Sequence, residues 1–392
     1  MHYTAAPVLG GVEAIVESHR KLLTGAGWPV RVVAGRGDCE LIAEVDSRHP
    51  EVEAIAVALG QGEDVSARFD GLKALLRDKL SESLRDCDLV IAHNVMTMPF
   101  NLPLAAALPE AGPPILAWTH DIAWVNPLYA KFQRPGWPYD LLHRPQPKTA
   151  YLAISELRRE QLCEAYGLDP GGVQVVPNGV DRATVLGLRP ESVRFGRRAG
   201  FLDADPLVLV PFRITRRKRI ELAIRAADEL RHKWPALKIV VSGPLGPHST
   251  DGAAYFEELR AERRRLHVED RVIFLHELAE RGRHPVDDEM MGELYQLAGA
   301  VLLTSESEGF GLPVLEAGLA RVAVVCRDLP VFREAGGDDL WTFPVEAPAG
   351  SVAAALGEAL MSRQARLQAD VRRYEWERQL GRLEEVIRHA AA

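Results

Sequence analysis

Short runs of β-branched and other apolar residues alternate along the chain with longer stretches in which apolar side chains recur every three or four positions. The short runs are typical of buried strands, and the longer stretches are typical of amphipathic helices. Such alternation indicates βαβ units and parallel sheets. The runs that we interpret as strands are Val30–Ala34, Asp88–Ala92, Ile115–Trp118, Ala150–Ile154, Val173–Val176, Leu207–Phe212, Lys238–Ser242, Val272–Leu275, Ala300–Thr304 and Val322–Cys326. The clearest helical stretches are Val12–Gly25, Phe69–Leu84, Ile220–Lys233, Ala253–Leu266 and Asp288–Leu297.

Two series of this alternation are separated near residues 177–179, where Pro-Asn-Gly gives a turn signal. A chain of 392 residues is also longer than one compact core usually allows. We therefore predict two doubly wound α/β domains, residues 1–176 and residues 177–374. Within the second domain, Asp181–Asp205 shows no strong period and is expected to be connecting structure. The final helix, residues 375–392, either caps the second domain or crosses back to the first.

The composition is that of an ordinary globular protein, and it excludes several classes of function. Apolar residues make up 47% of the chain and charged residues 26%, which is too apolar a balance for intrinsic disorder. The net charge of −8 argues against a nucleic-acid-binding protein, because such a protein needs surplus cations to neutralise phosphates.

Cysteine spacing and hydropathy bear on the compartment. The four cysteines are far apart and form no CxxC pattern, so we expect reduced thiols and no zinc site. No apolar run approaches the roughly 18 residues that indicate a membrane span. The N-terminus shows no cationic segment followed by an apolar one, so no signal peptide is indicated. The sequence predicts a soluble, cytoplasmic protein and leaves peripheral contact with a membrane open.

A loop rich in glycine carries the clearest chemical signal. The strand Ala300–Thr304 leads into this loop, and Pro313 then suits the first turn of a helix, where its missing N–H is no loss. Free amides and the positive end of the helix dipole form a site for a diphosphate. Gly309 and Gly311 let the backbone approach such a ligand without a Cβ in the way.

Two carboxylates, Glu308 and Glu316, bracket that loop. Their spacing around Gly-Phe-Gly-Leu-Pro resembles the signature of retaining glycosyltransferase family 4, which has the GT-B fold. The resemblance implies two Rossmann-like domains that face across a cleft, the first on the acceptor side and the second binding the nucleotide-sugar donor. It also implies that Glu308 contacts the donor sugar and Glu316 the nucleotide ribose. The backbone of Phe310, Gly311 and Leu312 then lies against the donor.

A second match to the family follows the strand Leu207–Phe212, where Arg213 precedes Lys218 by five residues. In the family an Arg and a Lys at this spacing bind the donor diphosphate. Without a divalent metal, fixed cations must meet the negative charge that develops on the leaving group. No Asp-x-Asp follows the carboxyl end of a predicted strand, where it could hold a metal, so we expect none. The other arginines of residues 216–219 fit a solvated basic turn.

The first domain carries two further matches. Gly10 and Gly11 stand at a helix start, where the family directs amides at the donor phosphate. His120 follows a strand and resembles the family's histidine that helps to hold the transferred hexose. Only Met1–Leu9 precede the glycine pair, whereas the family has a full strand there, so we expect most of that strand to lie upstream of Met1. His276 stands where the family usually has glycine. This leaves open whether the donor nucleotide is UDP or GDP.

A proline-rich stretch, Asn126–Lys148, follows His120 and carries Trp137 and Tyr139. Aromatic faces suit a sugar-containing acceptor, and loops at the carboxyl ends of parallel strands line ligand crevices. The alternative is a surface loop that packs its own aromatic side chains.

The sequence therefore predicts a metal-independent retaining glycosyltransferase without a cofactor. It is expected to move a hexose from a nucleotide-diphosphate sugar, a UDP- or GDP-sugar, to a hydroxyl of a carbohydrate or other small-molecule acceptor. Alternatives within the GT-B fold are a nucleotide-sugar epimerase, a phosphorylase and a non-catalytic nucleotide-sugar binder. A dinucleotide-dependent oxidoreductase is disfavoured because no GxGxxG follows an early strand. The oligomeric state stays open.

Overall fold

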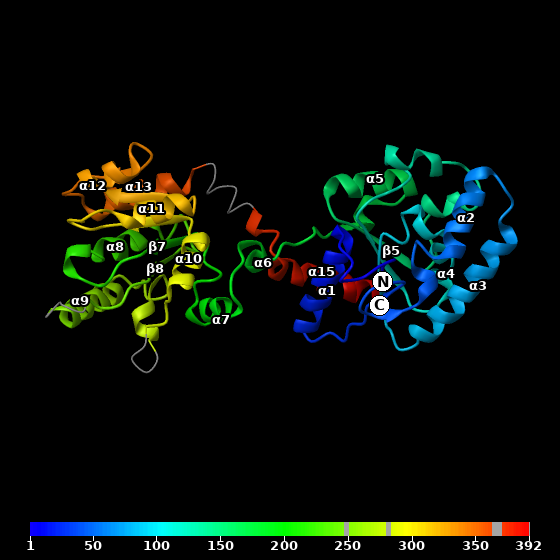
Figure 1. Cartoon of the computed structure of the whole chain (residues 1–392), viewed down its shortest axis with the longest axis horizontal. Helices are drawn as coiled ribbons and strands as arrows, with labels where there is room; N and C mark the ends of the chain where they lie inside the picture. Colours follow the sequence, from blue (N-terminus) through cyan, green and yellow to red (C-terminus); the bar gives the residue numbers. More distant parts are fainter. Residues whose placement is uncertain (247–250, 280–283, 363–370, 392) are drawn as a thin grey trace. The chain divides into compact units, whose positions relative to one another are not determined.

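The computed structural model describes residues 1–246, 251–279, 284–362 and 371–391 (Figure 1). The chain forms two compact units. Unit 1 consists of Met1–Val180 together with Tyr374–Ala392, and unit 2 of Asp181–Arg373. The two chain segments that leave unit 1 are paired, because the Val180 amide donates to the Tyr374 carbonyl at 2.7 Å.

Unit 1 contains a parallel sheet in the order β3-β4-β5-β6 and a separate parallel pair, β1 and β2. Its strands are β1 (Val33–Ala34), β2 (Glu40–Leu41), β3 (Val90–His93), β4 (Ile115–Thr119), β5 (Thr149–Ala153) and β6 (Gln174–Val175).

The first residues of the chain connect these two sheets. The His93 amide donates to the Met1 carbonyl at 2.9 Å, and the Gly35 amide donates to the Tyr3 carbonyl at 3.0 Å. Met1 to Ala5 are buried. The run before Gly10 is shorter than a full strand, yet these first residues lie in the middle of the unit 1 sheet.

The helices of unit 1 bury one face each. In α3 the buried residues are Phe69, Leu72, Leu76 and Leu80, spaced three or four apart as in an amphipathic helix. In Figure 1, α15 lies beside α1, and both ends of the chain belong to this unit. The helices are α1 (Gly11–Gly25), α2 (Pro50–Gln61), α3 (Ser66–Ser83), α4 (Leu102–Ala107), α5 (Glu156–Tyr166) and α15 (Trp376–Ala391).

Unit 2 is built on a six-stranded parallel sheet in the order β9-β8-β7-β10-β11-β12. The chain adds strands outward from β7 in one direction and then returns to add β10 on its other side. In such doubly wound sheets, ligands bind beyond the carboxyl ends of the two strands where the direction reverses. The strands are β7 (Leu207–Val210), β8 (Lys238–Val241), β9 (Val272–Phe274), β10 (Ala300–Leu303), β11 (Ala323–Arg327) and β12 (Trp341–Phe343). Both units confirm the prediction of doubly wound α/β architecture.

The helices of unit 2 pack against its sheet. Helix α13 packs against α8 and across β10, β11 and β12, while α11 packs against α12. The helices are α6 (Arg182–Leu186), α7 (Pro190–Ala199), α8 (Glu221–Leu230), α9 (Gly252–Arg265), α10 (Asp288–Leu297), α11 (Leu312–Leu319), α12 (Pro330–Gly336) and α13 (Ala349–Leu360).

The expectation that Asp181–Asp205 is mere connecting structure is wrong. This segment contains α6 and α7, and α7 buries Phe195 in the core of unit 2. Helix α7 is only ten residues long and mostly polar, so it offers few apolar residues by which a helix could be recognised. Its boundary signals are clear, with Pro190 at the start and Gly200 in the left-handed conformation at the end.

The apolar face of α15 indicates that this helix stabilises unit 1, and this can be tested. Leu383 is fully buried with Trp118 and Leu152 from the sheet. We expect Leu383→Ala to destabilise unit 1 by about 2–5 kcal/mol, the usual cost of truncating a buried leucine. Exposed Arg382, changed to alanine, is the matched control. Hydrogen exchange should quicken in β4 and β5 of the Leu383 variant while β7 and β8 are unchanged, and equal protection in both variants would contradict this.

Candidate functional site

Two loops meet at the point in unit 2 where strand order reverses. One follows β7 and runs through a short 3₁₀ turn, Arg216–Lys218, before α8. The other follows β10 and leads into α11. Because β7 and β10 are parallel neighbours, both loops lie beyond the same edge of the sheet. These are the loops in which the sequence predicts the donor-binding residues.

Lys218 and Glu308 come together from the two loops. The Lys218 Nζ lies 2.5 Å from Glu308 Oε2, and it also lies 3.8 Å from the centre of the Phe212 ring. Lys218 is only 7% exposed. Burial lowers the pKa of the Lys218 ammonium, and the Glu308 carboxylate opposes this shift. The structure thus holds a cation and a carboxylate in contact, with little water around them.

Direct hydrogen bonds join the same two loops around this pair. The Thr304 hydroxyl donates to the Lys218 carbonyl at 2.5 Å, and the Glu306 amide donates to the Arg217 carbonyl at 2.9 Å. The Arg217 guanidinium donates to the Ser307 carbonyl at 2.7 Å. One main-chain and two side-chain hydrogen bonds therefore join the two loops next to the pair.

Arg213 is exposed, and among the described residues its guanidinium has no ion-pair partner. Its backbone is closely supported from β8. A Cβ on Gly243 would lie 2.1 Å from the Phe212 carbonyl oxygen and 2.6 Å from the Arg213 amide nitrogen. Glycine is therefore required at 243, and the close approach fixes the main chain that carries Arg213.

The start of α11 has the form that an anion site needs. Gly311 caps the helix with φ of 88°, in the left-handed region that favours glycine, and Pro313 lies in the first turn. Phe310 and Leu312 flank it and are 61% and 58% exposed, which is unusual for such apolar side chains. An added Cβ on Gly309 would meet nothing within 4 Å, so the described residues do not themselves require glycine there.

Glu316 lies one turn into α11 and is exposed. It accepts a hydrogen bond of 2.5 Å from the Tyr295 hydroxyl on α10. Burial and the neighbouring carboxylate raise the pKa of Tyr295, so the hydroxyl stays a donor at neutral pH. Tyr295 escapes sequence analysis because its side chain comes from a helix whose apolar period already explains it.

In unit 1, His120 lies in a buried polar group. Its Nε2 is 3.1 Å from His93 Nδ1, and its Nδ1 is 3.4 Å from Asn178 Nδ2. The Asn94 side chain accepts from the His120 amide at 2.9 Å. Burial lowers the pKa of His120 to about 4, so its imidazole is neutral at neutral pH.

His19 on α1 extends this group and is not indicated by the sequence. Its ring lies edge-on to Trp118, with ring centres 4.3 Å apart, and also contacts the rings of His93 and Trp376. Both ring nitrogens are buried without a hydrogen-bond partner among the described residues. Burial lowers the pKa of His19 to about 3. In the sequence, His19 cannot be told from any other polar residue of a helix.

The glycine pair of unit 1 opens α1. Gly10 caps the helix, and a Cβ there would lie 2.1 Å from the Glu13 carboxylate. That carboxylate accepts from the Thr4 hydroxyl at 2.5 Å. Gly11 is the first helical residue, and an added Cβ on it would meet nothing within 4 Å. The atoms nearest to such a Cβ at Gly10 thus belong to the end of the Glu13 side chain.

The two most prominent aromatic residues of the proline-rich stretch differ in burial. Tyr139 is buried, which favours the interpretation as a loop that packs its own aromatic side chains. Trp137 lies edge-on to Phe69 of α3 with ring centres 4.6 Å apart, yet it is 51% exposed.

Two family models match the chain. The model of glycosyltransferase family 4 matches residues 9–184, and the model of glycosyl transferases group 1 matches residues 196–375. Between them they leave only residues 1–8, 185–195 and 376–392 unmatched. The chain belongs to this glycosyltransferase family. The matches confirm the resemblance carried by Glu308 and Glu316, and the two doubly wound units are those of the GT-B fold.

Individual relatives match parts of this glycosyltransferase chain. D-inositol 3-phosphate glycosyltransferase of Acidothermus cellulolyticus is 34% identical over 171 residues, 42% of this chain and 35% of that protein. The serotype-specific mannosyltransferase WbdA of Escherichia coli is 43% identical over 63 residues, 16% of this chain and 8% of that protein. The chain thus spans well under half the length of these relatives. A solved structure, Anabaena HepE in complex with UDP and glucose, is 17% identical with a TM-score of 0.36, covering 99% of each chain.

Among the described residues, no helix is long and apolar enough to cross a membrane. Nor do the described His, Cys, Asp and Glu side chains gather in groups of three or more that could hold a metal ion.

The histidine group predicts how the stability of unit 1 depends on pH. The folded state keeps His19, His93 and His120 neutral, whereas the unfolded chain binds protons near pH 6.5. The unfolded state therefore holds more protons below that pH, and stability falls as the pH drops from 6.5 towards 4. Each group contributes about 1.4 kcal/mol per pH unit over this window.

Urea unfolding at several pH values between these limits, followed by hydrogen exchange in β4, measures this slope. His19→Leu removes one titrating group and two buried nitrogens without partners. It should reduce the slope while leaving stability near neutral pH equal or higher. A slope that is the same in both proteins would contradict the prediction.

Proposed function

We propose that this chain is a retaining, metal-independent glycosyltransferase that moves a hexose from a nucleotide-diphosphate sugar to an acceptor hydroxyl. The observation that carries the proposal is the contact of Lys218 with Glu308 between the loops that follow β7 and β10. A buried cation, an unpaired exposed arginine and a helix start together suit a diphosphate. A carboxylate beside them suits the hydroxyls of a sugar.

The donor is proposed to bind along these two loops. The diphosphate lies between Arg213, Lys218 and the amides at the start of α11. The exposed Phe310 and Leu312 are then covered by the donor, with Gly309 and Gly311 leaving room for it, and this accounts for their exposure. Glu316 accepts from the ribose hydroxyls, and the Tyr295 hydroxyl keeps its carboxylate oriented. We propose a UDP- or GDP-sugar as the donor.

In the proposed reaction the bond between the sugar C1 and the diphosphate oxygen breaks, and a bond from the acceptor oxygen to C1 forms on the same face. The acceptor proton leaves with the diphosphate. Arg213 and Lys218 meet the charge that grows on the leaving group, which is where fixed cations accelerate a reaction most. Glu308 holds the sugar hydroxyls and so positions C1.

Three residues of unit 1 complete the proposal. The amides at Gly10 and Gly11 contact the donor phosphate, and His120 holds the transferred hexose. The lowered pKa of His120 supports this role, because a neutral imidazole can both donate to and accept from hydroxyls. The acceptor is a carbohydrate or another small molecule with a free hydroxyl.

Removing either partner of the central pair should nearly abolish transfer. Lys218→Ala and Glu308→Ala are each expected to lower turnover of the nucleotide sugar by about a hundredfold, since one such electrostatic contact is worth 10²–10³ in rate. Release of UDP or GDP from the corresponding sugars measures this. Arg225→Ala removes an exposed ion pair with Glu262 on the neighbouring helices and is the matched control. Near-wild-type turnover in either site variant would refute the assignment.

Metal independence gives a separate prediction. Since Arg213 and Lys218 supply the positive charge, turnover should be unchanged within about twofold by excess EDTA. Proton NMR of the product then reports whether the configuration at C1 is retained. Loss of turnover in EDTA with recovery in magnesium or manganese would contradict the metal-free mechanism, and an inverted product would contradict retention.

A further inference from the structure

The sequence suggests that the basic turn around Lys218 is simply solvated. In the structure its arginines contact other elements of unit 2. Arg216 donates to Asp251 at 2.6 Å and to Glu258 at 2.7 Å, both at α9. Arg217 donates to the Ser307 carbonyl in the loop after β10. Each of these arginines therefore has a partner on a different element of unit 2.

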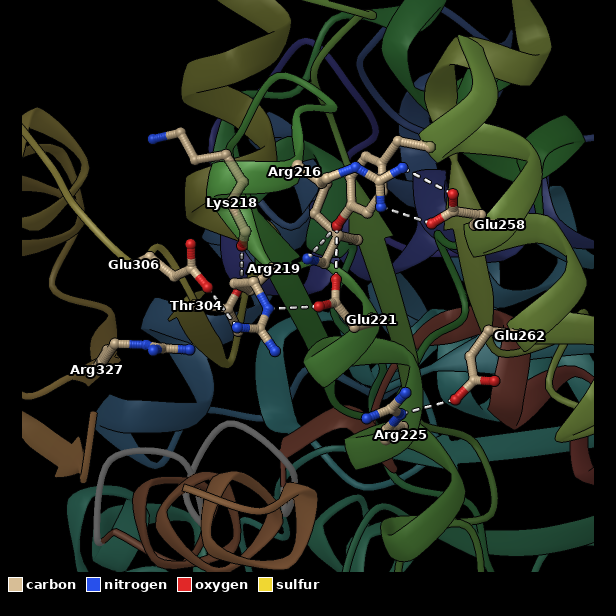
Figure 2. A network of polar contacts seen from close by, with 12 residues as sticks. Arg216, Lys218, Arg219, Glu221, Arg225, Glu258, Glu262, Thr304, Glu306 and Arg327 are labelled. Atoms are coloured by element: carbon tan, nitrogen blue, oxygen red, sulfur yellow. Dashed lines mark hydrogen bonds and ion pairs between the residues drawn. The ribbon is translucent and has the colours of Figure 1, made fainter. Parts of the chain in front are cut away.

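Arg219 has the most specific arrangement of the run. Figure 2 shows its guanidinium between Glu221, at the start of α8, and Glu306, in the loop after β10. The distance to Glu221 is 2.5 Å, and a charged hydrogen bond also joins Arg219 to Glu306. Its backbone has φ of 48°, a left-handed conformation that only glycine adopts readily. Such conformations persist where surrounding contacts determine them.

Both carboxylates that hold Arg219 are themselves fixed. The Tyr255 hydroxyl donates to Glu221 at 2.6 Å and accepts from the Ile220 amide at 3.0 Å, so Glu221 cannot swing away freely. Glu306 is held by its amide, which donates to the Arg217 carbonyl. Arg219 thus connects two anchored groups, one on each loop.

Arg327 adds a further positive charge near Arg219 and Glu306. It is 4% exposed and extends from the end of β11 toward Arg219 and the loop that carries Glu306 (Figure 2). It donates to the Val345 carbonyl at 2.6 Å, and it makes no ion pair within 4 Å among the described residues. The Glu306 carboxylate therefore faces positive charge from Arg327 as well as from Arg219.

We propose that Arg219 and Glu306 form a clamp that sets the separation of Lys218 and Glu308, so that Arg219 is a positioning residue for the donor site. Lys218 and Glu308 lie one residue before Arg219 and two residues after Glu306, on the same two loops. A short ionic link at this place fixes the spacing of the two groups that contact the donor. This inference rests on the proposed function only for the identity of the ligand.

Arg219→Gly is the sharpest variant, because glycine suits the left-handed backbone and the fold should be kept or stabilised. Binding of UDP and GDP to wild type, Arg219→Gly and Glu306→Gln is measured by calorimetry. The clamp predicts that both variants bind the nucleotide about tenfold more weakly, while their melting temperatures stay near that of wild type. The double variant should bind no worse than either single one, because one link is lost in each. Arg219→Lys keeps the charge and should recover part of the loss.

Whether Glu306→Gln weakens or tightens nucleotide binding distinguishes the clamp from a purely electrostatic role of Arg219. If Arg219 acted only through its charge on the ligand, removal of a carboxylate beside it would tighten nucleotide binding. Tighter or unchanged binding in Glu306→Gln therefore overturns the proposal. The Arg225→Ala control, which removes an ion pair that does not join the two loops, should bind as wild type does.

A second readout does not depend on any nucleotide. Hydrogen exchange at the Glu306 amide should quicken in Arg219→Gly and remain unchanged in Arg225→Ala, because the clamp holds the hydrogen bond from Glu306 to Arg217. If wild type binds neither UDP nor GDP, the proposed function fails. The exchange rate of the Glu306 amide still shows whether Arg219 and Glu306 form a clamp. Unchanged exchange in Arg219→Gly overturns the clamp whether or not nucleotide binds.

Discussion

The contact of Lys218 with Glu308 places a nearly buried ammonium against a carboxylate, and the surroundings must make that arrangement tolerable. Taking two charges out of water costs several kcal/mol per ion in real proteins, which the mutual attraction offsets only with good geometry and further bonds. The loops after β7 and β10 supply those conditions. The Thr304 hydroxyl fixes the Lys218 main chain, the Phe212 ring covers the ammonium, and a backbone hydrogen bond from Glu306 to Arg217 joins the loops.

The distribution of charge around this pair differs from that of the chain as a whole. The net charge is −8, and carboxylates near the basic turn share guanidinium groups: Arg219 contacts Glu221 and Glu306, and Arg216 contacts Asp251 and Glu258. These contacts offset part of the negative charge locally. Arg213 is exposed and makes no such pair among the described residues, so no contacting carboxylate offsets its charge. The local field that a ligand meets is thus set by pairing rather than by net charge.

The sequence was sufficient for those features that local chemistry dictates. Apolar runs predicted the strands of the two larger sheets except β12, and the glycine-bearing loop with Glu308 and Glu316 predicted the family. It was insufficient where a partner lies far along the chain. Arg219 and Glu306 are 87 residues apart, and nothing local distinguishes Arg219 from its solvated neighbours. His19 was hidden for the same reason, since its role comes from rings on β3, β4 and α15 that only the fold brings to it. Helix α7 was missed because it is short and mostly polar, although Pro190 and Gly200 mark its ends.

The two units keep their buried polar groups in different charge states. In unit 2 the Lys218 ammonium is buried against the Glu308 carboxylate, so a full charge is kept and paired. In unit 1 burial keeps His19, His93 and His120 neutral. A neutral imidazole offers one donor and one acceptor and so suits hydroxyl groups, whereas fixed cations suit the charge of a phosphate. Acid therefore opposes the native state of the histidine group, because the histidines of the unfolded chain take up protons that burial keeps off the folded ones.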